Sequence, residues 1–380
     1  MKASFLLQNL SRRISFVNHA VSAKSQLPIL LNFLIEAKKG RLIISATDLE
    51  IGIVAEVPAK IEEEGSVTIP AKAITELISV APIEKITLQT KPEGLFLTGE
   101  RVKTTFQTMP TDEFPKLYGD KGSELIRLKR NTIDKEFSRV VFAASQDAER
   151  PALSGVLIKE GESMSKEGFS LVATDGYRLS LQREALGGTK KKKTTDASMI
   201  VPSRVIRELI LMNKEASEGG DIGVYVPQET NQVIFSQNDV TIVGRLIEAE
   251  FPNFEKIIPQ DYSTKTIFEK EALQRAVKAS YVFARQTANI VKLSIMKDKI
   301  VVSANAPSFG SSVMEVDAKT TGEENEIAFS VRYLLDFFSN IDGEEVSFEM
   351  TGPLNPGVFK IVGDDTYLHL IMPIRIQQEA

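Results

Sequence analysis

Few side chains of this sequence have the types and spacing that acid–base chemistry requires. Asp48 and Asp175 each follow an apolar run in an Ala-Thr-Asp turn, and two such carboxylates could in principle share a proton-transfer site. The only histidines are His19, on the expected surface of a helix, and His369, in a strand-like run. Cysteine is absent, and there is no Walker glycine loop, HExxH or GxSxG motif. We therefore expect no catalytic residue, no metal and no cofactor.

The stretch 171–181, LVATDGYRLSL, places one of these aspartates in a hairpin. Its apolar start predicts a strand, which Thr174, Asp175 and Gly176 interrupt. Asp accepts hydrogen bonds from the backbone that follows it, and Gly tolerates positive φ, so both residues suit a turn. The alternation of apolar and polar residues then resumes. Taken alone, this pattern predicts a β-hairpin and no function.

The chain carries three copies of this hairpin and of two other segments. The hairpin recurs as 41–53, 169–181 and 299–311, a second segment as 67–78, 199–210 and 327–338, and a third ends at Ile35, Ile158 and Ile295. The copies follow at intervals of about a third of the 380-residue chain, far longer than the units of a solenoid. Asp48 and Asp175 are equivalent residues of different repeats. They should therefore lie far apart, which argues against a catalytic pair.

Each repeat is predicted to contain two helices among several strands. The first helices have apolar residues at steps of three and four, beginning near Leu10, Phe137 and Leu273, which is the spacing of one helix face. The second helices begin at Pro70, Pro202 and Ser330, because Pro suits the first turn and Ser the N-cap. Alternating segments such as 86–89 and 95–98 predict strands. This order predicts an α+β fold of three tandem similar domains.

Phe-Pro pairs mark the ends of the first two repeats, at 114–115 and 251–252. Proline disfavours helix in the residue before it and ends strand ladders, so each pair reads as the entry to a linker. We expect domains at 1–122, 123–259 and 260–380.

Composition is ordinary for a globular protein, with 42% hydrophobic and 26% charged residues and a net charge of −5. No run approaches the ~18 apolar residues of a membrane-spanning helix, and the start lacks a signal-peptide pattern. The absence of cysteine fits a reducing compartment. We expect a cytoplasmic protein with no membrane partner. The run from Lys190 to Lys193 reads as a solvated loop.

Basic residues recur at matched places on the expected helices. A basic residue on a helix is usually just solvated, but recurrence in three repeats favours a shared surface that attracts a phosphate backbone without reading bases. The residues expected to face DNA are Arg12, Arg13, Lys72, Lys135, Arg139, Arg204, Arg207, Arg275, Lys278 and Arg332.

Taken as a whole, the chain resembles the beta subunit of bacterial DNA polymerase III, the DNA sliding clamp family. The resemblance runs from LPILLNFLI at 27–35 and ATDLE at 46–50, through VATDGYRL and FPNF, to MPIRI at 372–376. It implies sheets outside and two helices per domain lining a ring that two chains close around duplex DNA. It also implies a processivity factor without catalytic activity that tethers the replicative polymerase.

The resemblance further implies partner sites. Expected partners are double-stranded DNA bound without sequence preference, a polymerase subunit, a clamp loader, other proteins with a clamp-binding motif, and a second copy of the chain. A hydrophobic peptide pocket is expected from Leu153, Thr174, Gly176, Tyr177, Arg178, Leu179, Pro252, Ile257, Met372, Pro373, Ile374 and Arg375, with Arg178 and Arg375 holding a polar or acidic group at the rim. The dimer contact is expected from Ile74, Phe106, Val282 and Phe283, and Lys24 is expected in a loop that contacts DNA.

Departures from the family pattern leave alternatives open. Residues 377–380 extend past the usual end, Tyr177 replaces a histidine of some relatives, and Pro151 and Ala152 replace an aromatic pair. The last change weakens any prediction of base stacking by that loop. One alternative is a paralogue that binds proteins but not DNA, which would be favoured by a monomer. Another is an enzyme on a triplicated fold, which would need a pocket with perturbed acids.

Overall fold

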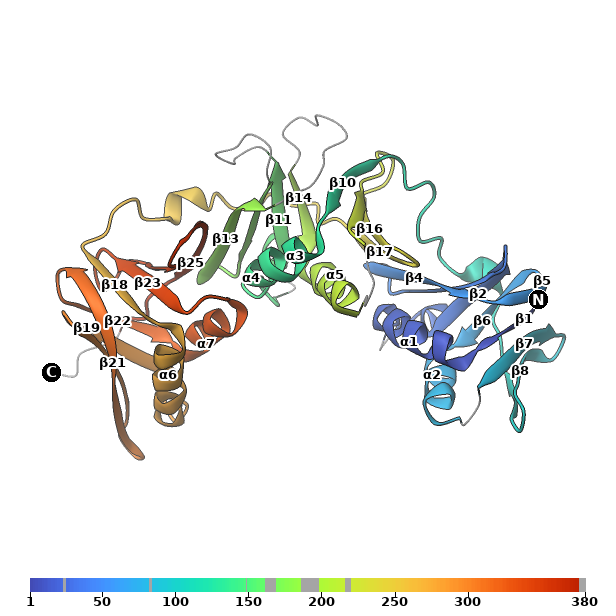
Figure 1. Ribbon diagram of the computed structural model, residues 1–380, viewed down its shortest axis with the longest axis horizontal. Coiled ribbons are helices and arrows are strands. Elements are labelled where there is room, and N and C mark those ends of the chain that lie inside the picture. The colour runs from blue at the N-terminus through green and yellow to red at the C-terminus, as the bar shows by residue number, and fades with distance from the viewer. Residues whose placement is uncertain are drawn as a thin grey trace. The chain divides into compact units, whose positions relative to one another are not determined.

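The structure, a computed structural model, describes residues 1–22, 25–81, 84–147, 149–160, 169–185, 198–215 and 220–375. Strands dominate over helices, so the predicted α+β class is confirmed (Figure 1). Contacts between residues divide the described chain into two compact units. The first holds residues 1–130 and 204–246, and the second holds residues 131–185, 198–203 and 247–375. The predictions for Lys24, for Lys190–Lys193 and for the tail 377–380 lie outside the described residues.

The first unit contains two antiparallel sheets, with strand orders β5-β1-β7-β8-β9 and β10-β15-β16-β17-β4-β3-β2-β6. Helices α1 (Leu7–Val17) and α2 (Ala71–Val80) pack against each other, and nearly all of α5 (Ser203–Glu215) belongs to this unit. Its strands are β1 (Lys2–Leu6), β2 (Asn32–Lys38), β3 (Arg41–Thr47), β4 (Ile51–Pro58), β5 (Lys60–Glu63), β6 (Gly65–Pro70), β7 (Lys85–Lys91), β8 (Gly94–Thr98), β9 (Lys103–Phe106), β10 (Glu124–Leu128), β15 (Ile222–Tyr225), β16 (Gln232–Gln237) and β17 (Val240–Arg245).

The second unit is built on one sheet, of order β14-β11-β12-β13-β25-β24-β23-β18-β21-β20-β19-β22. Its helices are α3 (Arg130–Thr132, beginning at the unit boundary), α4 (Ser138–Val141), α6 (Lys270–Ala284) and α7 (Val331–Asn340). Its strands are β11 (Gly155–Glu160), β12 (Phe169–Thr174), β13 (Arg178–Ala185), β14 (Ser198–Pro202), β18 (Thr264–Glu269), β19 (Ile290–Ile295), β20 (Lys299–Ala306), β21 (Gly310–Gly322), β22 (Asn325–Ser330), β23 (Glu345–Met350), β24 (Gly357–Ile361) and β25 (Asp364–Ile371).

The sheets cross the repeats because strands of neighbouring repeats pair directly. Strand β17 of the second repeat pairs with β4 of the first, with Gly244 opposite Ile51. Strand β13 of the second repeat pairs with β25 of the third, with Arg178 opposite Ile371. The second repeat is therefore shared between the two units, although the repeats are sequential in the chain. The boundaries near residues 122 and 259 stay predictions.

The helices lie where the apolar spacing predicts them, with one addition. Helix α6 contains its whole predicted stripe, and α1 contains all of its stripe except Val21. The stripe of the second repeat begins at Phe137 in a π-helical turn (Ile133–Phe137) and continues into α4. Helices α2, α5 and α7 begin directly after Pro70, Pro202 and Ser330. Neither Pro70 nor Ser330 caps its helix through a side-chain hydrogen bond. The sequence interpretation missed a short strand before each first helix, namely β1, β10 and β18. No helix among the described residues is long and apolar enough to span a membrane.

Candidate functional site

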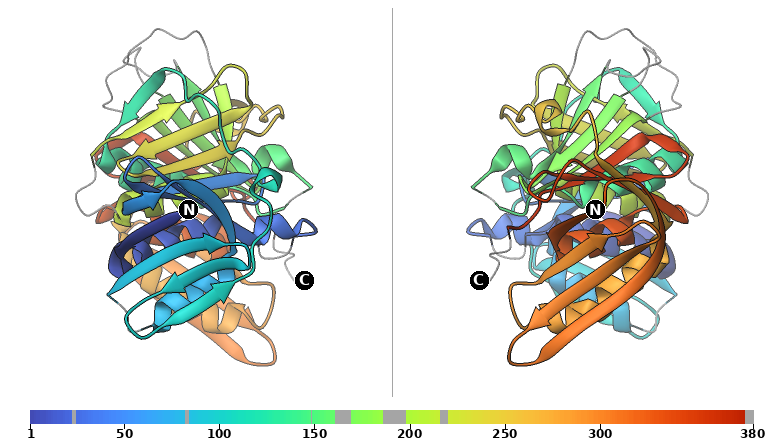
Figure 2. Two further views of the ribbon diagram at one scale, coloured as in Figure 1. Left: turned by 90° about the vertical axis from the view of Figure 1, so that its right-hand side faces the viewer. Right: turned by 90° about the vertical axis from the view of Figure 1, so that its left-hand side faces the viewer.

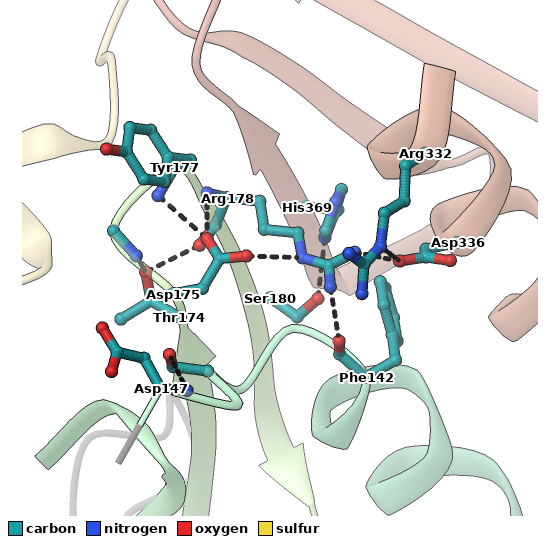
Figure 3. A network of polar contacts seen from close by, with 12 residues as sticks. Phe142, Asp147, Thr174, Asp175, Tyr177, Arg178, Ser180, Arg332, Asp336 and His369 are labelled. Carbon is teal, nitrogen blue, oxygen red and sulfur yellow. Dashed lines mark hydrogen bonds and ion pairs between the residues drawn. The ribbon is translucent and has the colours of Figure 1, made fainter. Parts of the chain in front are cut away.

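The turn between β12 and β13 is held by its own side chains (Figure 3). The Thr174 hydroxyl donates to the carbonyl of Arg178 over 2.6 Å and accepts the Gly176 N–H at 3.0 Å. Oδ1 of Asp175 accepts the N–H groups of Tyr177 at 2.9 Å and Arg178 at 3.0 Å. Gly176 has φ +92°, a conformation that glycine adopts without a steric penalty. The turn chemistry predicted from the sequence is confirmed, and it leaves Tyr177 exposed.

Arg178 links this turn to α7 through a buried polar network (Figure 3). Its Nε donates to Oδ2 of Asp175 at 3.1 Å, its Nη1 to Oδ2 of Asp336 at 2.6 Å, and its Nη2 to the carbonyl of Phe142 at 2.9 Å. The guanidinium also lies over the Tyr333 ring, 4.7 Å from the centroid. The side chain is only 5% exposed. Three of its N–H groups therefore donate inside the protein, and the prediction that Arg178 also holds an acidic group at a pocket rim stays a prediction.

His369 on β25 lies beside this network in the core. Its Nδ1 is 2.7 Å from the Ser180 hydroxyl, and its ring stacks on Phe337 with centroids 5.0 Å apart. Burial lowers the pKa of His369 well below its ordinary value, and the Arg178 charge adds to this effect. The ring therefore stays neutral at physiological pH. This is the environment of a structural histidine in a strand, as the sequence suggests.

The end of the described chain runs alongside the turn. The N–H of Met372 donates to the carbonyl of Tyr177 at 2.8 Å, and the N–H of Ile374 donates to the carbonyl of Ala328 in β22 at 2.8 Å. Residues 372–374 are thus held between the second and third repeats. Two segments that are far apart in sequence, the turn and the chain end, come together as the peptide-pocket prediction requires.

The twelve predicted pocket residues divide into a buried and an exposed set. Thr174, Arg178 and Leu179 are buried, and Leu179 packs with Phe254 in an apolar cluster. The exposed or partly exposed members are Leu153, Gly176, Tyr177, Pro252, Ile257, Met372, Pro373, Ile374 and Arg375. An apolar surface over a buried apolar floor is compatible with a peptide site.

A cavity of about 380 Å³ lies beside the turn, on the side of α7. Of the predicted pocket residues, only Tyr177 and Arg178 line it. The sequence does not assign the other lining residues to a pocket, and these are Ala144, Ser145, Gln146, Asp147, Arg150, Asp175, Arg332 and Tyr333. Several of these residues carry other predictions from the sequence: Ala144 belongs to a helix stripe, Asp175 to the turn, and Arg332 to the basic residues expected to face DNA.

The basic residues expected to face DNA fall into exposed and engaged groups. Arg12, Lys72, Lys135, Arg207, Arg275, Lys278 and Arg332 are exposed. Exposure does not mean that they are unpaired, since Lys72, Lys135, Arg275 and Arg332 each lie within 4.0 Å of a carboxylate. Arg13 forms an ion pair with Asp239 at 2.7 Å, and Arg204 pairs with Asp48 and donates to the carbonyl of His19 at 2.8 Å. The recurring basic position at the start of α2, α5 and α7 is therefore only partly available to a phosphate.

The prediction that Arg139 faces DNA is wrong, because the side chain is 3% exposed. Its Nε donates to Asp342 at 2.6 Å, and its Nη1 donates to Asp364 at 2.7 Å. The guanidinium lies over the ring of Tyr367. The polar face of this helix, opposite its apolar stripe, is covered by residues of the third repeat. The spacing of residues within one helix cannot reveal such a cover.

The π-helical turn directly before α4, Ile133–Phe137, contains an acid with a shifted pKa. Burial raises the pKa of Glu136 from 4.5 to about 7, against the opposing charges of Lys135 and Arg139. The folded state thus holds this proton longer than the unfolded chain does. Its stability should fall as pH rises from about 4.5 through 7, by at most about 3 kcal/mol.

At each pH, the free energy of unfolding of Glu136→Gln is compared with that of the unchanged protein. We expect this difference to favour the variant more at pH 8 than at pH 5, because glutamine has no proton to lose. Urea unfolding at the two pH values measures this difference. Glu229→Gln, at an exposed glutamate, is the matched control and should leave the difference unchanged. An equal effect of both substitutions would show that burial of Glu136 is not the cause.

The four residues of the predicted dimer contact also divide. Ile74 is fully buried inside its own unit, so its side chain is not available at an edge, and that part of the prediction is wrong. Phe106 is 7% exposed and ends β9, which is the outer strand of its sheet. Val282 is exposed, and Phe283 packs edge-on against the exposed Phe309 with centroids 5.7 Å apart. Of the four, Val282 and Phe283 have the accessible surface that a contact needs.

Acid–base and metal chemistry find little support among the described residues. The Asp48 carboxylate accepts hydrogen bonds from the N–H groups of Glu50 and Ile51 and forms an ion pair with Arg204. Asp175 likewise accepts hydrogen bonds within its own turn. His19 pairs with Glu208 through Nδ1 at 2.8 Å. In the part of the chain that the structure describes, no three His, Asp or Glu side chains group as metal ligands would.

Comparison with known families gives three matches in chain order. Residues 1–118 match the DNA polymerase III beta subunit N-terminal domain, residues 127–253 its central domain, and residues 255–375 its C-terminal domain. The beta sliding clamp of Synechococcus elongatus is 27% identical over 99% of this chain and 100% of its own length. That of Staphylococcus aureus is 28% identical over 94% of each chain.

Solved structures agree over nearly the whole chain. The DNA polymerase III beta subunit of Thermotoga maritima superposes with a TM-score of 0.87 at 28% identity, covering 99% of this chain and all of that one. The DNA polymerase sliding clamp of Bacillus subtilis gives 0.90 at 25% identity with the same coverage. The three-domain α+β architecture is thereby confirmed. The chain belongs to the bacterial DNA polymerase III beta subunit family, the DNA sliding clamps.

Proposed function

We propose that two copies of this chain close into a ring around duplex DNA and tether the replicative polymerase to it, without catalytic chemistry of their own. The ring would act in the cytoplasm, where a clamp loader opens it. The observation that carries the tethering role is the junction of the 174–178 turn with residues 372–374. It joins two distant segments into one surface with exposed Tyr177 and Met372.

The partner of this surface is a short peptide with apolar side chains. Tyr177, Ile257 and Met372 offer exposed apolar area, and methionine adapts its shape to different partners. Gly176 allows close approach of a second backbone, since a Cβ placed there would meet only the flexible end of Arg150 at 3.5 Å. Arg375 is an exposed cation at the rim that could bind an acidic group, while three N–H groups of Arg178 already donate within the protein.

DNA contact in this proposal is electrostatic and weak. The exposed cations Lys72, Lys278 and Arg332 lie on three different helices, and the protein as a whole carries a net charge of −5. Phosphate contacts release counterions and carry no sequence information, so binding should fall steeply with salt. Retention would then depend on closure of the ring.

Met372→Ala tests the peptide site. Truncation of one exposed anchor at the centre of a small interface should weaken binding of a polymerase-derived peptide about tenfold or more. Calorimetry on the intact dimer measures the affinity. Met296→Ala, which truncates another exposed methionine of the second unit, is the matched control and should bind as the unchanged protein does.

Two outcomes would contradict this proposal, one for the position of the peptide site and one for the function. Unchanged peptide affinity in Met372→Ala would place the pocket elsewhere. Peptide binding by a protein that stays monomeric and does not associate with DNA would favour a protein-binding scaffold with the clamp fold.

A further inference from the structure

A second cavity, of about 420 Å³, lies within the first unit. It is lined by the 47–52 turn, by residues 115–117 after the first Phe-Pro pair, and by residues of β16 and β17. This is the junction of the first repeat with the second. The proposed peptide site lies at the junction of the second repeat with the third, so the two locations are related by the internal repeat.

The two turns have the same hydrogen bonds. The Thr47 hydroxyl donates to the carbonyl of Ile51 at 2.9 Å and accepts the N–H of Leu49 at 3.0 Å. Oδ1 of Asp48 accepts the N–H groups of Glu50 at 3.1 Å and Ile51 at 3.0 Å. These are the bonds made by the 174–178 turn, atom for atom. The backbone frame at the two junctions is therefore equivalent.

The strand that closes each site is equivalent too. The N–H of Arg245 donates to the carbonyl of Glu50 at 3.0 Å, just as the N–H of Met372 donates to the carbonyl of Tyr177. The strand registers agree, because Ile51 faces Gly244 and Arg178 faces Ile371. Arg245 thus occupies in the first unit the place that Met372 occupies in the second.

The lining of the first-unit cavity carries positive charge, whereas the exposed residues of the proposed peptide site are mostly apolar. Arg245 and Lys116 are both exposed in its lining, and no ion pair is recorded for either within the described chain. Glu50 is the single acidic residue of the lining. In a protein with a net charge of −5, two basic side chains without carboxylate partners in one cavity favour an anionic occupant.

Two other lining residues, Leu49 and Gln232, have unusual local structure. Leu49 is 51% exposed and has φ +78°, a strained conformation for a residue with a branched apolar side chain. Gln232 donates through Nε2 to the carbonyl of Leu117 at 3.0 Å, while its buried Oε1 has no hydrogen-bond partner among the described residues. Leu49 thus offers the site an exposed apolar contact.

We infer that the cavity between the first and second repeats is a second docking site, and that it binds a partner segment in which an apolar side chain stands next to a carboxylate. Leu49 contacts the apolar side chain, while Lys116 and Arg245 bind the carboxylate. The occupant's class, a peptide, rests on the proposed function of the equivalent site. The two sites would differ in preference, because Arg245 replaces Met372 and Glu50 replaces Tyr177.

The test uses the intact full-length dimer with Met372→Ala, so that the other site is weakened, and a tetrapeptide probe, Leu-Asp-Leu-Phe with a free carboxylate. Methyl NMR should show saturable shifts of Leu49 and Leu117. Lys116→Glu with Arg245→Glu should weaken this binding about tenfold, since it reverses the local charge. Leu49→Asn should weaken it about fivefold, because Asn tolerates positive φ but lacks the apolar side chain.

Two controls separate the site from general charge attraction. Lys60→Glu with Lys129→Glu makes the same charge change at exposed residues of the first unit outside the cavity and should leave the affinity unchanged. A probe with Asn in place of Asp and an amidated end should bind at least fivefold more weakly.

The inference is overturned if the methyl groups of Leu49 and Leu117 do not respond to the probe. A response in the protein with native Met372 that is confined to Leu153, Ile257 and Met372 overturns it while leaving the proposed function standing. Equal losses in the cavity variant and the control variant also overturn it, because they show non-specific attraction.

Discussion

Protein loaded onto a nicked circular plasmid by the clamp loader of its own cell is expected to be lost when the plasmid is cut once, and to stay when it is not. A closed ring leaves a circle only by opening, whereas it slides off a free end. Direct attraction is expected to contribute little to retention, because Arg13, Arg139 and Arg204 are paired with carboxylates of the same protein. Gel filtration of labelled protein with the two DNA forms measures retention.

A cut plasmid with a bulky protein bound at each end is the matched control. It has the same phosphates as the free linear form, yet it should retain the protein as well as the circle does. Retention on the unblocked linear form equal to that on the circle would contradict the ring. Removing Lys72, Lys278 and Arg332 together should flatten the salt dependence of direct DNA binding while retention on the circle persists at low salt.

The local features of the site could be predicted from sequence because they depend on neighbouring residues. Thr174, Asp175 and Gly176 define their turn through bonds that span at most four positions. The helix stripes likewise require only the 3.6-residue period. The internal repeat also argued against a catalytic pair. Asp48 and Asp175 occupy equivalent turns of different repeats, so their carboxylates are not neighbours in one site.

The features that sequence reasoning missed depend on contacts between distant segments. Arg139 is polar and lies off its helix stripe, yet Asp342 and Asp364 bury it. The sequence predicts Ile74 at an edge, but its side chain is fully buried in its unit. Such pairings have no signature in local spacing, since either partner alone fits a solvated surface. The pairing of β17 with β4 and of β13 with β25 is non-local in the same way.

Arg178→Ala is expected to be the most destabilising single substitution at the candidate site. It removes the one group that neutralises Asp175 and Asp336 together and that donates to the carbonyl of Phe142. Breaking a fully buried ion pair by removing one partner typically costs about 3–5 kcal/mol. The loss here should lie at or below the lower end of that range, because the side chains of Asp175 and Asp336 are 15% and 36% exposed. Urea unfolding of the intact dimer should show the loss in the transition of the second unit.

Arg332→Ala is the matched control for this substitution. Arg332 also lies near Asp336, with Nε 3.9 Å from Oδ2, but its side chain is 68% exposed. Exposed ion pairs contribute roughly 0–1 kcal/mol, so this variant should unfold almost as the unchanged protein does. Arg178→Lys should fall between the two, because an ammonium group cannot reproduce the planar fork of a guanidinium that reaches three acceptors. Similar stabilities for Arg178→Ala and Arg332→Ala would mean that the network does not hold the turn against α7, and the candidate site would then owe its position to the apolar cluster around Leu179 and Phe254.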